Sequence, residues 1–418
     1  TKLSALDVSK NVALRSLNSS SCSLKKLDLS NNSALMTLDC SGNSITSLDL
    51  SHNLELVEVK CCGAGTWSSW AETDTWRIRS LDLTGCSKLS KLDCSSQLLS
   101  SLNLSDCVSL TELNVHHNTL LGLNISHNTK LQKLDCSYNK ISSLNLSANY
   151  SLSSYNIRSN PLKVINVGNV LSSLEFYADD SYKEQTELKI VAPELKRVTI
   201  EQGNGFNGRL IGIDFSNCTS VESVCIRLSY ISEINFSVLP LLRYVSVYSV
   251  QLQSLDFSHN TCLASVYFDG CSNLREVVLP ESSSFTSGTF YGCTKLTDIN
   301  FADAPNCLYL SFRSCSSLLS LDLSNNMSLQ ELKLYQCTSL KYLNLGENPY
   351  LKALSMGVCG SQCDVKGLRL EKLSINAKEL NVKDLPALTE LSVGSCNLKT
   401  LDLSGNPHLK KLTLSGTA

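Results

Sequence analysis

The sequence predicts an all-β-rich solenoid with little helix, in which short extended segments stack coil upon coil. A Leu-x-Leu pair recurs along most of the 418 residues, in alternating steps of eleven and ten residues near the start. Each pair is followed three residues later by Asn or Cys. No segment shows the 3-4 apolar spacing of a helix over three turns. Regular repetition of this kind indicates units that contact only their neighbours in a stack.

The stretch 24–53, LKKLDLSNNSALMTLDCSGNSITSLDLSHN, shows the unit. Alternation within each pair buries one side of a short strand. The Asn that follows is expected to turn inward and bond the backbone of the bend, so that stacked Asn side chains form a ladder. The three pairs are Leu27 and Leu29, Leu38 and Cys40, Leu48 and Leu50, and their Asn residues are Asn32, Asn43 and Asn53.

With two extended segments per coil, the chain is expected to form one solenoid of about nineteen coils over residues 1–418. The repeat is interrupted near 62–80, 177–212, 280–295 and 357–373, and resumes after each interruption. We therefore predict loops that project from one solenoid rather than linkers between domains. Because the chain starts and stops inside repeats, we also expect it to be a segment of a longer protein.

Composition excludes several classes of function. Charged residues make up 18% and the net charge is −2, which gives no electrostatic footprint for nucleic acid or an anionic membrane. No apolar run approaches the roughly 20 residues of a membrane helix. No nucleophile elbow, phosphate-binding loop or zinc motif is present, so we expect neither an enzyme nor a cofactor.

Weaker motifs have simpler interpretations. The glycines at 203, 205 and 208 have dinucleotide spacing but no surrounding βαβ unit, and indicate a flexible turn. His116, His117 and His127 are interpreted as solvated turn residues rather than metal ligands, so no metal site is predicted.

Nineteen cysteines are present, and most occupy inward positions of the repeat. Four replace the second Leu of a pair and ten take the Asn position. We expect these to act as small buried side chains. Neighbouring cysteines on one side would have parallel Cβ vectors, which suit a disulfide poorly. Cys359 and Cys363 are the best-placed candidates for a disulfide.

The unit LxxLDCSxNxIxxLDLSxNxx resembles the nested 21-residue leucine-rich repeat of bacteria called the IRREKO class, LxxLxCxxNxLxxLDLxxNxx. The resemblance covers most of the chain. It implies a leucine-rich-repeat superhelix in a secreted or surface protein, often of Bacteroidetes, that binds a partner. The segment FYGCTKLTDI within 279–299 is similar to the repeat of treponemal-type surface antigens, which is again a binding class.

Nesting gives each coil two outward surfaces. One, here called the uniform face, repeats small polar residues such as Asp49 and Ser51. The other, here called the variable face, is the concave one by family resemblance. It starts in the same way, with Asp93 and Asp135, and then gains aromatic and basic residues. Its candidate partner-binding residues are Arg158, Tyr177, Glu201, Arg227, Tyr244, Tyr248, Tyr267, Asp269, Tyr309, Arg313, Lys333 and Tyr335.

Strand alternation points these side chains away from the core. Tyr and Arg are enriched at binding hot spots, and the uniform face lacks aromatics. Recognition of a partner is therefore one interpretation. The other is a solvated β surface stabilised by cross-strand aromatic pairs.

A second candidate site is the interruption that contains Trp67, Trp70 and Trp76. Exposed indoles on a loop can stack on sugars or anchor a partner. Alternatively, they fold back onto the solenoid as a satellite cluster.

These observations predict a non-catalytic binding protein that is extracellular or at the cell surface. An outer-membrane lipoprotein is one of the forms that fit this prediction. Its function would be adhesion through a protein partner. One alternative is a surface glycan-binding component of nutrient uptake. Another is a structural spacer for a further domain.

Overall fold

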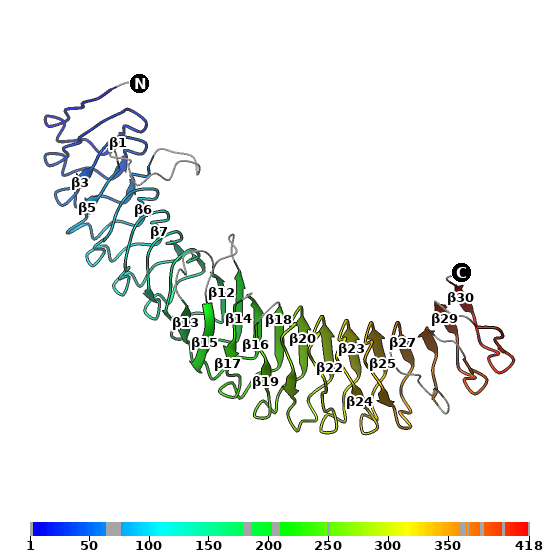
Figure 1. Cartoon of the computed structure of the whole chain (residues 1–418). Helices are drawn as coiled ribbons and strands as arrows, with labels where there is room; N and C mark the ends of the chain where they lie inside the picture. The colour runs from blue at the N-terminus through cyan, green and yellow to red at the C-terminus, as the bar shows by residue number, and fades with distance from the viewer. Residues whose placement is uncertain are drawn as a thin grey trace. The chain divides into compact units, whose positions relative to one another are not determined.

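The computed structural model describes residues 3–63, 77–178, 185–202, 210–228, 230–248, 251–359, 365, 368–376, 380–394 and 398–416. Within these residues the chain forms a β-solenoid of leucine-rich repeats, with about sixteen turns and no helix (Figure 1). The predicted fold class is confirmed, and the number of turns differs slightly from the predicted number of about nineteen.

The chain divides into two compact units. Unit 1 comprises Thr1–Glu194 and Gln202–Leu210, and unit 2 comprises Leu195–Glu201 and Ile211–Ala418. All strand pairs with a described register are parallel and join equivalent positions of successive coils, as a solenoid requires.

The variable face of unit 1 is a parallel sheet of three-residue strands, followed along the chain by the longer β12. These strands are β1 (Ser16–Asn18), β2 (Thr37–Asp39), β4 (Glu58–Lys60), β6 (Lys91–Asp93), β7 (Glu112–Asn114), β8 (Lys133–Asp135), β10 (Ser154–Asn156) and β12 (Ser173–Ala178). In each three-residue strand the middle side chain points inward and its two neighbours point outward.

The variable face of unit 2 has longer strands, most of them of five residues. They are β14 (Arg197–Gln202), β16 (Ser223–Arg227), β18 (Tyr244–Tyr248), β20 (Ser265–Asp269), β22 (Ser287–Tyr291), β23 (Tyr309–Arg313), β25 (Glu331–Tyr335), β27 (Ala353–Met356), β28 (Lys372–Ile375), β29 (Glu390–Gly394) and β30 (Lys411–Ser415). A five-residue strand places three side chains outward, so this face carries three rows of side chains.

The uniform face has fewer and shorter ladders. In unit 1 it contains β3 (Ser47–Asp49), β5 (Ser80–Asp82), β9 (Ser143–Asn145), β11 (Val164–Asn166) and β13 (Thr186–Val191). In unit 2 it contains β15 (Leu210–Asn217), β17 (Glu233–Ile234), β19 (Ser254–Asp256), β21 (Glu276–Val278), β24 (Ser320–Asp322) and β26 (Tyr342–Asn344). The predicted two extended segments per coil are therefore present.

The predicted Asn ladder is confirmed. Asn128 is fully buried, and its Nδ2 donates to the carbonyls of Leu104 at 3.1 Å and Cys107 at 2.8 Å, both in the preceding coil. Asn149 repeats the arrangement on Ile125 and on the backbone of Asn128. These amides satisfy buried carbonyls of the bend that no strand partner reaches, which explains why the position recurs.

The cysteine positions also follow the expectation. Among the described cysteines, those in the second-Leu position are buried, and those in the Asn position are buried or half-buried. All described cysteines are free thiols. Burial raises the pKa of Cys40 to about 12, so the thiol stays protonated. The proposed pair of Cys359 and Cys363 lies partly outside the described residues.

The loop predicted at 280–295 is wrong over Ser287–Tyr291, which forms strand β22 between β20 and β23. Its Ser and Gly content suggested a loop. Gly288, however, fills an inward Leu position, because a Cβ there would lie 2.9 Å from Phe290 Cε2 and 3.1 Å from Leu310 Cδ2. The Phe290 ring stacks on Phe312 with centroids 4.8 Å apart and lies where a side chain at position 288 would have to fit.

The other interruptions are only partly described. Within 177–212 the described residues contribute to β12, β13, β14 and β15. Residues 64–76, 179–184, 203–209, 360–364 and 366–367 lie outside the described part of the chain, so the loops predicted there stay predictions.

Candidate functional site

The aromatic and basic side chains of unit 2 lie in register on the variable face. Along one outward row, parallel pairing places Tyr248 beside Asp269, Asp269 beside Tyr291, Tyr291 beside Arg313 and Arg313 beside Tyr335. Each of these side chains is exposed or half-buried. The outward orientation predicted from strand alternation is therefore confirmed for Tyr248, Asp269, Arg313 and Tyr335.

Five side chains of this face form a continuous chain of contacts. The Arg227 guanidinium lies over the Tyr248 ring, 4.5 Å from its centroid, and Nη1 bonds the Glu201 carboxylate at 3.0 Å. The Tyr248 ring contacts Tyr267 with centroids 5.3 Å apart, and Tyr267 meets Tyr291 edge to face at 5.8 Å. Aromatic pairs at such distances hold one another in place and restrict the rotamers of all members.

Electrostatics agree with this packing. A hydrogen bond from Arg227 to the Tyr248 hydroxyl is the main cause that raises the pKa of Arg227. Partial burial, followed by the neighbouring Asp269 carboxylate, raises the pKa of Tyr267. Both groups therefore keep their protons at neutral pH, and the face offers hydroxyl and guanidinium donors.

A second group lies on β23 and β25. The Lys333 ammonium is 5.2 Å from the Tyr309 ring centroid and pairs with Glu331 at 2.8 Å. The hydrogen bond that the Lys333 ammonium donates to Glu331 is the main cause that raises the pKa of Lys333. Arg313, between Tyr291 and Tyr335 in its row, has no carboxylate partner among the residues that the structure describes.

The remaining predicted residues are placed differently. Tyr244 is 49% exposed and is the first residue of β18, so it lies in a different outward row from Tyr248. Arg158 and Tyr177 belong to unit 1, so the predicted set is divided between the two units. The Arg158 guanidinium lies 5.3 Å from the Tyr138 ring centroid, and the Tyr177 hydroxyl donates to the Glu175 carboxylate.

Tyr291 is a residue that the sequence reasoning missed. It contacts Tyr267 in the centre of the group, but it lies within 280–295, which was interpreted as a loop. The step of eleven residues from Val266 to Val277 and again to Gly288 was the available signal, because it continues the strand register through that segment.

The prediction of a solvated His117 is wrong. Its side chain is 4% exposed, its ring stacks on Tyr138 with centroids 4.1 Å apart, and its Nδ1 is 2.7 Å from Nδ1 of His116. Burial, reinforced by His116, lowers the pKa of His117 to about 4. A left-handed turn at φ 55° turns this side chain along the stack rather than into solvent. Among the described residues, no group of His, Cys, Asp and Glu has the geometry to hold a metal ion.

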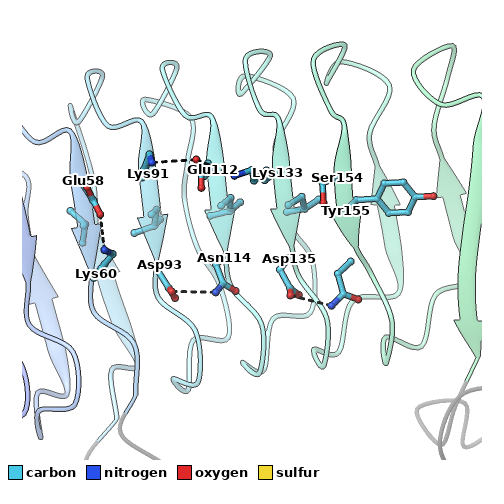
Figure 2. A pocket seen from close by; sticks show the side chains of 15 residues that line it. Glu58, Lys60, Lys91, Asp93, Glu112, Asn114, Lys133, Asp135, Ser154 and Tyr155 are labelled. Atoms are coloured by element: carbon cyan, nitrogen blue, oxygen red, sulfur yellow. Dashed lines mark hydrogen bonds and ion pairs between the residues drawn. The ribbon is translucent and has the colours of Figure 1, made fainter.

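Sequence reasoning also passed over a hollow in unit 1. A trough of about 430 Å³ crosses β4, β6, β7, β8 and β10 on the variable face (Figure 2). Two outward rows of polar side chains form its walls, and the backbone of the inward Leu row forms its floor. Its volume lies in the range typical of ligand sites.

The three tryptophans of the second candidate site, Trp67, Trp70 and Trp76, lie outside the described residues. The part of the chain that the structure describes has no helix with the length and apolarity of a membrane span.

Comparison with known proteins supports the repeat class. Residues 243–352 match the family described as BspA type Leucine rich repeat region, in six copies. This match covers 110 of the 418 residues and includes most of the aromatic group of unit 2. A search of curated proteins finds no match to the sequence.

Solved structures of bacterial leucine-rich-repeat proteins are similar at low identity. The functional domain of InlJ from Listeria monocytogenes is 21% identical, with 96% of this chain and 68% of that chain covered and a TM-score of 0.36. The protein LIC12759 of Leptospira interrogans is 18% identical, with 98% and 92% covered and a TM-score of 0.35. The internalin InlF of Listeria monocytogenes is 17% identical, with 79% and 88% covered and a TM-score of 0.34. The resemblances to the IRREKO class and to treponemal-type antigens stay predictions. The fold is that of a leucine-rich-repeat solenoid, and residues 243–352 match the BspA-type repeat family.

Proposed function

We propose that the chain is a non-catalytic binding protein, secreted or at a bacterial cell surface, that recognises a protein partner through the Tyr/Arg face of unit 2. This face comprises Glu201, Arg227, Tyr244, Tyr248, Tyr267, Asp269, Tyr291, Tyr309, Arg313, Lys333 and Tyr335. Repeat solenoids typically use extended strand surfaces for binding. Arg158 and Tyr177, in unit 1, are not needed for this proposal.

The observation that carries the proposal is the contact chain from Arg227 through Tyr248 and Tyr267 to Tyr291. Tyr and Arg dominate binding hot spots, because they combine large apolar area with a polar group. Side chains already held by one another lose little entropy when a partner docks, so more of the contact energy contributes to affinity. Aromatic packing for stability alone would not require these rings to remain outside the core.

Charge on this face indicates what the partner presents. Arg227 and Lys333 are paired with Glu201 and Glu331, whereas Arg313 has no carboxylate partner among the described residues. A guanidinium beside two tyrosines is suited to a bidentate contact with a carboxylate. We therefore expect an acidic side chain of the partner at Arg313, surrounded by apolar contacts with the tyrosines.

The experiment compares two triple variants of the whole chain. Immobilised protein captures candidate partners from extracellular and cell-surface protein preparations, and the affinity of each purified candidate is then measured by biolayer interferometry. Tyr248→Ala, Tyr267→Ala and Tyr291→Ala together should weaken binding by about 100-fold or more. The matched control replaces three exposed tyrosines elsewhere, Tyr150, Tyr342 and Tyr350, by Ala. Tyr342 lies on β26, so the expectation that the uniform face lacks aromatics is wrong at this position.

Arg313→Ala provides a sharper measurement with the same partner. It should weaken binding about tenfold or more, and Arg313→Lys should restore only part of the loss, because an ammonium cannot bind a carboxylate bidentately. Equal affinity of the Tyr248/Tyr267/Tyr291 variant and the wild type would show that the Tyr/Arg face is not the site.

A further inference from the structure

The trough of unit 1 is independent of the Tyr/Arg face and has a different chemistry. It runs across the strands, so its long axis passes from coil to coil (Figure 2). One wall consists of Glu58, Lys91, Glu112, Lys133 and Ser154, and the other consists of Lys60, Asp93, Asn114, Asp135 and Asn156. The Cα atoms of the two walls are two residues apart on each strand, roughly 7 Å, and the hollow runs along five successive strands.

Several wall positions repeat every second coil. Lys91 and Lys133, Asp93 and Asp135, and Asn114 and Asn156 are each separated by 42 residues, which is two coils. Neighbouring strands are about 4.8 Å apart, so the same polar group returns roughly every 10 Å along the trough. A ligand that matches this surface therefore advances by about one strand spacing per unit and repeats after two units.

The polar groups are held in fixed orientations. Asp93 Oδ1 accepts the backbone N–H of Ser95 at 3.1 Å and its hydroxyl at 2.6 Å, while Oδ2 accepts Asn114 Nδ2 at 3.2 Å. Asp135 repeats this arrangement with Ser137 and with Asn156 Nδ2 at 3.1 Å. Each carboxylate–amide pair presents an acceptor beside a donor, which matches adjacent hydroxyl groups, because each hydroxyl both donates and accepts.

The charges of the trough are largely compensated. Lys91 lies 3.3 Å and Lys133 lies 3.5 Å from the Glu112 carboxylate, and Lys60 pairs with Glu58 at 2.8 Å. Hydrogen bonding by Lys91 is the main cause that lowers the pKa of Glu112. Three lysines face four carboxylates in the lining. A polyanion would gain little from this balance, whereas a neutral hydroxyl-rich chain would meet donors and acceptors without a charge penalty.

We infer that this trough binds a neutral, extended β-1,4-linked glycan with about one sugar per coil. Such a chain is nearly straight, advances by about one strand spacing per sugar, and turns each sugar over relative to the last, so it repeats every two sugars. The two-coil repeat of Asp93 and Asn114 at Asp135 and Asn156 then contacts chemically equivalent hydroxyls.

A polyproline-II peptide is the competing ligand, because its three-residue turn of about 9.3 Å also fits the two-coil spacing. Grooves that bind such peptides are lined with aromatic side chains. The walls of this trough carry charged and amide groups, and Tyr155 at one end is the single aromatic residue of the lining. The scarcity of aromatic rings weighs against both ligands. A proline chain, however, has no N–H donor for the Asp93 and Asp135 carboxylates, whereas each sugar hydroxyl can donate, so the polar pairs of the walls favour the glycan.

The test measures binding of defined oligomers to the whole chain by isothermal titration calorimetry. Cellohexaose and chitohexaose are the probes. Maltohexaose, whose α-1,4 linkage curves the chain, and a proline decamer are the controls. Binding of a β-1,4 hexamer with at least tenfold preference over maltohexaose is expected. Equal binding of maltohexaose, tighter binding of the proline decamer, or no binding of either β-1,4 hexamer would overturn the inference.

Paired substitutions locate the binding. Asp93→Asn with Asp135→Asn keeps an oxygen for the Ser95 and Ser137 turns but removes both carboxylates, and should weaken hexamer binding about tenfold. The matched control is Asp49→Asn with Asp82→Asn, because these residues lie side by side on the uniform face and make the same turn contacts. The control should bind as the wild type does. Equal loss in both pairs would place the effect in the fold and overturn the assignment of the trough.

Discussion

The Tyr155 hydroxyl accepts the backbone N–H of Glu175 at 3.0 Å and donates to the Ser173 carbonyl at 3.2 Å. Tyr155 occupies the inward Leu position of β10, where its strand partner Leu134 carries an ordinary Leu side chain. The described ladder of this sheet ends at β10, and the phenol reaches the backbone of β12 in place of a strand pair. Burial raises the pKa of Tyr155, so it remains a donor at neutral pH.

Removing this hydroxyl should loosen the junction between β10 and β12. For Tyr155→Phe we expect a loss of about 1 kcal/mol in the free energy of unfolding, since water can reach the two exposed backbone groups and replace part of the bonding. Urea denaturation followed by circular dichroism measures the loss, with Tyr150→Phe on an exposed ring as the control. A stability equal to that of the wild type would show that the two bonds contribute nothing.

His117 should make the stability of unit 1 depend on pH. Its folded pKa of about 4 lies below the unfolded value near 6.5, so the unfolded chain binds more protons between these values. The contribution of the neutral, buried His117 to the free energy of unfolding is complete above about pH 6.5. It is lost as the pH falls toward 4. By pH 5 the loss should be about 2 kcal/mol.

His117→Asn tests the assignment, because Asn tolerates the left-handed backbone at this position. The variant should be less stable at pH 7 and should show a shallower loss between pH 7 and 5 in urea denaturation. A slope identical to that of the wild type would assign the pH dependence to other groups. His127→Ala, at an exposed turn, is the comparison.

The Asn ladder should be sensitive to loss of a single amide. Asn128→Ala removes the amide donor from the carbonyls of Leu104 and Cys107, which keep only their turn bonds from the N–H groups of Cys107 and Leu110. We expect destabilisation by about 1–3 kcal/mol, because two buried acceptors each lose one of their two bonds. Thermal unfolding should show a marked fall for Asn128→Ala and almost none for Asn124→Ala, whose side chain is exposed. Similar values for both variants would contradict a structural role of the ladder.

Gly288 should resist even the smallest side chain. Gly288→Ala would place a Cβ 2.9 Å from Phe290 Cε2 and 3.1 Å from Leu310 Cδ2, so the core rings must shift. Overpacking of this kind costs about 1–3 kcal/mol. Leu310→Ala removes one of the clashing groups, so Gly288→Ala should cost less stability in the Leu310→Ala background than in the wild type. Thermal unfolding of the two single variants and the double variant measures this difference. Additive losses would show that the predicted clash does not occur.

By itself the sequence determined the stacked class of the fold, because the inward positions repeat with a period that only a coil of short strands can bury. The regular positions of Asn32, Asn53 and Asn128 also predicted the ladder. A polar side chain that recurs at an inward position needs a partner there, and the backbone of the bend provides it. Outward exposure of Tyr248 and Tyr267 followed from alternation alone.

Only the tertiary structure decided which outward side chains contact one another. Tyr267 and Tyr291 are 24 residues apart in the chain and meet because parallel register places β20 beside β22. The same register aligns Asp93 with Asn114 as one wall of the trough. His117 was misjudged because a left-handed turn, invisible in the repeat pattern, directs its ring onto Tyr138. Periodicity specifies the side of a strand on which a residue lies, whereas contacts between coils depend on register and turn geometry.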